Sequence, residues 1–194
     1  MAKLVRSVLV TGFPGRQPAV HLVRELANRS ERSVCCLVTE GRQERAIELL
    51  DAFPESARER VSIWLGDPRS MDLGLSGEEF AVLAQGVEVI HHCASITDPA
   101  ATREEAAGNV RAAAEILELA EAAPRLKRLV CWSSATVSGN REGFVKEAEL
   151  DDTMGFRNPV EESLYDMERM LRESAEELPI VILRPAVMVG DSLT

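Results

Sequence analysis

The stretch SVLVTGFPGRQP, residues 7–18, joins a short apolar run to a helical pattern through two glycines. Gly12 can supply the positive φ of a tight turn, and Gly15 can let the backbone approach a phosphate group. The free N–H groups of a helix that begins after the turn would point at the same anion. This order of strand, glycine turn and helix predicts a dinucleotide site that includes Gly12, Phe13, Pro14 and Gly15.

Pro18 occupies the position at which such a turn carries its third glycine. Proline is tolerated in the first turn of a helix, where an N–H has no helical partner. Its ring affects how closely the helix packs on the strand, and it removes one N–H that could serve a phosphate. We therefore expect Pro18 to weaken cofactor affinity before it disturbs the fold.

Short runs rich in valine and isoleucine recur along the chain and alternate with helical patterns. Such runs are typical of buried parallel strands. Their alternation with helices predicts an α/β fold, a doubly wound parallel sheet of the Rossmann type with about six strands, in one domain over residues 1–194. The predicted strands are Ser7–Val10, Val34–Val38, Val61–Leu65, Val87–His91, Arg128–Trp132 and Ile180–Leu183.

Two helices are predicted to begin at Asp98-Pro99 and Asn158-Pro159, because a side-chain acceptor followed by proline is typical of a helix start. In the second helix, apolar residues spaced four, three and four apart define one buried face. That face carries Val160, Leu164, Met167 and Leu171, and the other predicted helices are Pro18–Ala27, Gln43–Leu50 and Ser76–Gln85.

The composition narrows the range of partners. The chain has 22 Lys and Arg against 32 Asp and Glu, and its formal net charge of −10 argues against nucleic acid and anionic membranes. No apolar run reaches the ~20 residues that a membrane span needs. The four cysteines, at positions 35, 36, 93 and 131, lack metal-binding spacing. We expect buried free thiols, no metal and a cytoplasmic location.

Ligands of doubly wound sheets bind at the carboxyl ends of the strands. Glu40 and Arg42 follow the second predicted strand. An acidic residue there binds the adenosine ribose and selects NAD, whereas an arginine accommodates the additional phosphate of NADP, so both cofactors stay open. Ala94 and Ser95, after the fourth strand, are small enough for a nicotinamide ribose to lie against the backbone.

Three residues could act on a substrate carbonyl. Ser134 follows the fifth strand, and Tyr165 is the only tyrosine in the chain. Arg169 lies four residues after Tyr165, on the same side of the predicted helix. The tyrosine would donate a proton while a hydride arrives from the cofactor, Ser134 would orient the carbonyl, and the cation would lower the tyrosine pKa.

These motifs resemble the extended short-chain dehydrogenase/reductases, most closely the thioester reductase or male-sterility (fatty acyl-CoA reductase) type. The resemblance implies that the turn Thr11–Pro18 binds the dinucleotide and that Asp67, in GDPRSMDLGLS, contacts adenine beside Pro68. It implies that Asn109, the structural asparagine of the long helix, belongs to the cofactor site. It also implies a catalytic Ser134, a YxxxK-type tyrosine at Tyr165 and a cofactor contact at Pro185, within Arg184–Asp191.

The resemblance also defines departures. Arg169 stands where the family has its catalytic lysine, and Thr39 where acyl reductases often place an arginine that selects NADP. The family's substrate lobe would follow Thr194, and a sheet edge without it predicts a homo-oligomer. The implied activity is an NAD(P)-dependent reductase, with NADP slightly preferred, acting on a small-molecule carbonyl or an acyl thioester. The alternatives are a non-catalytic nucleotide-binding or scaffolding module and the cofactor half of a longer reductase.

Overall fold

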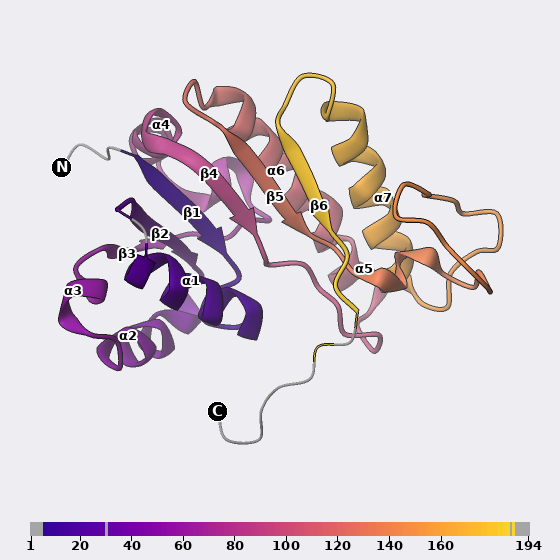
Figure 1. The fold of residues 1–194 in the computed structure, drawn as a ribbon, viewed down its shortest axis with the longest axis horizontal. Coiled ribbons are helices and arrows are strands. Elements are labelled where there is room, and N and C mark those ends of the chain that lie inside the picture. The colour runs from indigo at the N-terminus through magenta and orange to yellow at the C-terminus, as the bar shows by residue number, and fades with distance from the viewer. Residues whose placement is uncertain (1–5, 30, 187, 189–194) are drawn as a thin grey trace.

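The computed structural model describes residues 6–29, 31–186 and 188. Within them, six parallel strands form one sheet in the order β3-β2-β1-β4-β5-β6 (Figure 1). The predicted α/β fold is confirmed, and each predicted strand is found to within one residue. The strands are β1 (Ser7–Thr11), β2 (Ser33–Val38), β3 (Val61–Leu65), β4 (Val87–His92), β5 (Arg128–Trp132) and β6 (Ile180–Leu183).

Helices cover both faces of the sheet and enclose two apolar cores. On one face, α1, α2 and α3 pack over the strands through residues such as Val20, Leu50 and Ala57. On the other, α4, α6 and α7 pack through residues such as Ile116 and Leu164. The helices are α1 (Gln17–Arg29), η1 (Glu40–Arg42), α2 (Gln43–Asp51), α3 (Glu55–Arg58), η2 (Met71–Gly74), α4 (Gly77–Gly86), α5 (Arg103–Ala106), α6 (Gly108–Ala122), η3 (Ala135–Ser138) and α7 (Pro159–Ser174).

The prediction of a helix start at Asp98-Pro99 is wrong. The Asp98 carboxylate accepts a hydrogen bond from the backbone N–H of Ala100 at 2.9 Å and closes a turn instead. Thr102 is the N-cap of α5, in a reciprocal capping box with Glu105. The start at Asn158 is confirmed, because its side-chain oxygen accepts from two N–H groups of the first turn of α7 at 3.0 Å each.

The predicted buried thiols are also found, since all four cysteines are free and buried. In the part of the chain that the structure describes, no helix is long and apolar enough to cross a membrane. Among the same residues, no three His, Cys, Asp or Glu side chains gather in a group that could hold a metal ion.

The register of the central strands brings the carboxyl ends of β1, β2 and β4 to the same level. Thr11, at the end of β1, pairs with Leu37 of β2 and with His92 of β4. The chain leaves β1 toward β2 on one side, whereas β4 lies on the other side, so the crevice between these connections lies at the end of β1. Open α/β sheets bind ligands at this switch point.

Candidate functional site

The glycine turn after β1 lies against the end of β4. Gly12 has a φ of +90°, and a Cβ added to it would lie 2.7 Å from the carbonyl oxygen of Cys93. The backbone N–H of Arg16 donates to the Gly12 carbonyl at 2.8 Å and closes the turn into α1. Both the conformation and the close approach therefore require glycine at position 12.

Gly15 leaves room for an arginine from another strand end. Arg42, at the end of η1 after β2, reaches across the turn so that its Nη1 fills the place that a Cβ at position 15 would take. Burial and the nearby Arg42 charge both lower the pKa of Arg16, while Asp98 opposes this effect. Two guanidinium groups thus lie near each other beside the turn, an arrangement that favours an anion between or beside them.

A cavity of about 170 Å³ lies between this turn, the ends of β2 and β3, and the start of α6. Of the predicted cofactor residues, it brings together Gly12, Phe13, Arg42, Asp67, Pro68, Ala94 and Asn109. We call it the first cavity. Pro14 and Glu40 do not line it, and Glu40 is exposed on η1.

The Asp67 carboxylate is held at the cavity wall by Arg69. Arg69 donates to it from its backbone N–H at 2.9 Å and from its guanidinium at 2.9 and 2.7 Å. These hydrogen bonds hold the pKa of Asp67 below its usual value. The residue that the resemblance assigns to adenine is therefore an ionised acceptor in a fixed orientation.

Asn109 joins three parts of the site. Its amide exchanges hydrogen bonds with the backbone N–H and C=O of Ile96, after β4, at 2.6 and 3.0 Å. It also donates to the Ser163 hydroxyl of α7 at 3.0 Å. The side chain is buried, so these bonds fix the segment after β4 between α6 and α7.

A second cavity of about 210 Å³ also borders the glycine turn and the start of α1, and it shares Arg16 with the first cavity. Trp132 and Ser133 line it, and the buried Ser133 hydroxyl and Trp132 indole N–H have no hydrogen-bond partner among the described residues. Burial raises the pKa of Cys93 to about 12, so this thiol stays protonated near neutral pH. Of the predicted residues, Gly15, Pro18, Ser95 and Pro185 also line this second cavity.

None of the three predicted catalytic residues lines either cavity. The Ser134 hydroxyl accepts from the backbone and side chain of Thr136 and caps η3. The Tyr165 ring packs on Phe156, with centroids 5.3 Å apart. Burial, together with Asp152, raises the tyrosine pKa, and Arg169 opposes this only in part.

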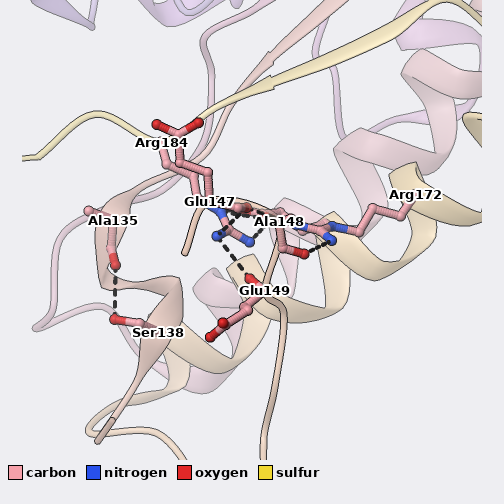
Figure 2. Close-up of polar contacts among 8 residues, drawn as sticks. Ala135, Ser138, Glu147, Ala148, Glu149, Arg172 and Arg184 are labelled. Atoms are coloured by element: carbon pink, nitrogen blue, oxygen red, sulfur yellow. Dashed lines mark hydrogen bonds and ion pairs between the residues drawn. The ribbon is translucent and has the colours of Figure 1, made fainter. Parts of the chain in front are cut away.

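A buried carboxylate anchors the loop that precedes α7. Glu168 is fully buried and pairs with the guanidinium of Arg184, after β6, at 2.6 Å. Arg184 and Arg172 donate in turn to backbone carbonyls of residues 147–149, as Figure 2 shows. The network ties the long loop between η3 and α7, which stands out beside α7 in Figure 1, to the helix.

A known family shares the sequence pattern on which this site is built. The sequence profile of the male sterility proteins matches residues 10–194. The chain belongs to this family of NAD-binding domains. The resemblance to the thioester reductase branch of the extended short-chain dehydrogenase/reductases is thereby confirmed.

Several similar proteins are parts of peptide synthetases or related synthases. The chain is 28% identical over 205 residues to a linear gramicidin synthase protein of Brevibacillus parabrevis, covering 97% of this chain and 4% of that protein. The terminal R domain of the myxalamid PKS-NRPS pathway superposes with a TM-score of 0.84 at 29% identity, over 99% of this chain and 51% of that one.

A reductase (R) domain of a nonribosomal peptide synthetase from Mycobacterium tuberculosis superposes with a TM-score of 0.76 at 26% identity, over 98% of this chain and 50% of that one. This chain of the male sterility family therefore spans about half the length of these solved relatives, and less than a tenth of the gramicidin synthase protein.

Sequence reasoning missed several cavity residues. Arg16 directly follows the glycine turn, and a cation at the start of α1 could have been predicted from the sequence to bind an anion. Arg69 lies two residues after Asp67, within reach of its carboxylate. Trp132 and Ser133 carried no signal of their own, because only the folded structure leaves their polar atoms buried and, among the described residues, without partners.

Proposed function

We propose that this domain binds NADP(H), with the adenosine half in the first cavity and the pyrophosphate at the glycine turn. The observation that carries the proposal is the placement of Arg42 against Gly15, beside Arg16. Neither arginine forms an ion pair with a carboxylate within the described residues. Positive charge left unpaired in a chain of net charge −10 is suited to a phosphate ligand.

The same arginine favours NADP(H) over NAD(H). Arg42 lines the first cavity, and Glu40, the acidic residue that would bind ribose hydroxyls, does not. An additional phosphate on the ribose would meet a guanidinium there, whereas an unmodified ribose would leave that charge without a ligand.

The second cavity is suited to the nicotinamide half. Both cavities are lined by residues of the glycine turn and by Arg16, so a dinucleotide that crosses the turn would reach both. Trp132 and Ser133, whose buried polar atoms lack partners among the described residues, line this cavity. Pro18 borders this cavity and supplies no N–H of its own.

Reduction of a carbonyl or an acyl thioester is the second candidate function. It is favoured by the similarity to the reductase (R) domain of the nonribosomal peptide synthetase from Mycobacterium tuberculosis. A non-catalytic nucleotide-binding module is the alternative, and it agrees better with the positions of Tyr165 and Arg169 outside both cavities.

The cofactor preference is tested by calorimetric titration of the wild-type chain and of Arg42→Gln with NADPH and NADH. We expect the wild type to prefer NADPH. The substitution should weaken the affinity for NADPH by about 10- to 100-fold, as expected for the loss of a charge-assisted hydrogen bond, and should change the affinity for NADH little. Arg45→Gln is the matched control, because Arg45 is exposed on α2 and pairs with Glu48. An equal loss of affinity for NADPH and NADH in Arg42→Gln would contradict a contact between Arg42 and the additional phosphate.

A further inference from the structure

The direction of α7 determines which of its residues approach the bound dinucleotide. This helix connects two parallel strands, β5 and β6, so it begins at the carboxyl edge of the sheet and runs away from it. Its first turn, capped by Asn158, therefore lies at that edge of the sheet. Tyr165 lies five residues after Val160, which is about 7.5 Å further along the helix axis.

One face of α7 packs toward the residues that border the cavities. Ser163 accepts a hydrogen bond from Asn109, and the Met167 sulfur lies 3.9 Å from the Ser95 hydroxyl. Val160 and Leu164 lie on the same face, at 2% and 0% exposure. Within α7, all of which the structure describes, this face offers no cation at the level of the site, and the Ser163 hydroxyl is already bonded to Asn109 and to the Val160 carbonyl.

Tyr165 and Arg169 lie on other sides of the helix. At about 100° per residue, Tyr165 is rotated roughly 140° from Val160, and Arg169 roughly 180°. The Tyr165 hydroxyl interacts with Asp152 and its ring with Phe156, both in the loop between η3 and α7. Arg169 is exposed and pairs along the helix with Asp166 and Glu173.

The side of α7 that carries Tyr165 contacts the loop between η3 and α7. Arg172 lies on the same side, one turn beyond Arg169, and donates to the Ala148 carbonyl of the loop at 2.8 Å. Tyr165 contacts the same loop through Asp152 and Phe156. Both residues anchor the loop to the helix, so the position of Tyr165 is explained without contact to a cofactor.

We propose that Val160 and Leu164 occupy the two α7 positions that a proton-donating hydroxyl and its cation would need, so that this domain holds the dinucleotide without reducing a carbonyl at it. The inference rests on the proposed binding of NADP(H). Reduction of a carbonyl moves a hydride from the nicotinamide to the carbonyl carbon and a proton to the carbonyl oxygen. Valine and leucine have no proton to give, and their i, i+4 spacing in the first two turns matches such a pair.

The test uses the single tyrosine of the chain as a probe. Biosynthetic labelling with fluorotyrosine gives one ¹⁹F resonance in the wild type, that of Tyr165, which is followed by NMR while NADPH is added. Calorimetry on the same sample reports whether NADPH binds. We expect saturable binding, a Tyr165 resonance that does not move, and an affinity for NADPH within twofold of wild type in Tyr165→Phe.

A second variant places the probe on the inner face. In Val160→Tyr combined with Tyr165→Phe, we expect the ¹⁹F resonance to shift as NADPH saturates the site. Circular dichroism reports whether this variant folds, and if it does not, the wild-type resonance and the affinity of Tyr165→Phe decide the question.

Movement of the Tyr165 resonance on saturation, together with a tenfold or greater loss of NADPH affinity in Tyr165→Phe, would overturn the proposal. Absence of calorimetric binding would instead overturn the proposed function, and with it this inference.

Discussion

The guanidinium of Arg42 lies over the Cα of Gly15, so that a Cβ on residue 15 would overlap its Nη1. Arginine and glycine follow β2 and β1, and the contact places the cation that we assign to the additional phosphate of NADP(H) beside the turn that we assign to the pyrophosphate. A methyl group at position 15 would displace the side chain and not the backbone, because the neighbouring atoms belong to the far end of Arg42.

We therefore expect Gly15→Ala to keep the stability of the domain within about 1 kcal/mol of wild type and to weaken NADPH binding about tenfold or more. Urea unfolding and calorimetry measure the two effects. Gly77→Ala is the control, since a Cβ there would meet nothing within 4 Å. Unchanged NADPH affinity in Gly15→Ala would count against a role for Arg42 at the turn.

Substitution of Gly12 should affect the fold itself. Gly12→Ala combines a positive φ with a backbone clash at 2.7 Å, and neither the Cys93 carbonyl nor the turn can move cheaply. Gly143→Ala is the matched control, because Gly143 has a φ of +81° in open space. We expect a cost of about 1–2 kcal/mol for the control and clearly more for Gly12→Ala in urea unfolding. Equal costs would show that the clash with β4 is relieved.

Acid should destabilise the domain through His92. This side chain is fully buried, its Nδ1 lies 3.0 Å from the Thr11 hydroxyl, and burial lowers its pKa to about 4 from 6.5. Between these pH values, His92 is therefore protonated in the unfolded chain and neutral in the folded chain. The stabilisation is complete above pH 6.5 and falls by about 3 kcal/mol as the pH drops to 4.

Urea unfolding between pH 7.5 and 4 measures this loss. His92→Gln should flatten the dependence on pH, whereas His21→Gln, at an exposed position of α1, should leave the wild-type slope. A slope in His92→Gln as steep as that of wild type would assign the acid sensitivity to other groups.

Removal of the Glu168 charge should destabilise the domain strongly. Glu168→Gln leaves the guanidinium of Arg184, only 15% exposed, without its carboxylate. Breaking a buried ion pair costs about 3–5 kcal/mol. Thermal unfolding should show this loss, and proteolysis should cut residues 139–158 faster. Glu173→Gln, at 66% exposure on the same helix, should change stability by less than about 0.5 kcal/mol. Similar behaviour of the two variants would remove the anchoring role of Glu168.

The sequence was sufficient for the sheet, because valine-rich runs separated by amphipathic helices have few alternative arrangements. The helix start at Asp98 was misplaced, since an aspartate before proline caps a turn as well as a helix, and only the capping box at Thr102 distinguishes the two.

The catalytic candidates illustrate a second limit. The spacing of Tyr165 and Arg169 indicates that they share a side of α7, but it does not say which side faces the sheet. The buried apolar stripe of Val160, Leu164 and Met167 shows which side of α7 faces the sheet, and Tyr165 does not lie on that side. The catalytic roles of Ser134, Tyr165 and Arg169 remain predictions, and the labelled-tyrosine experiment tests that of Tyr165.

The central claim, that this domain binds NADP(H) between the glycine turn and Arg42, is tested most directly by titrating the wild-type chain with NADPH and following nicotinamide fluorescence. We predict saturable enhancement with a dissociation constant below ~0.1 mM, and reversal by excess NADP⁺. No change in nicotinamide emission up to millimolar NADPH would contradict the claim.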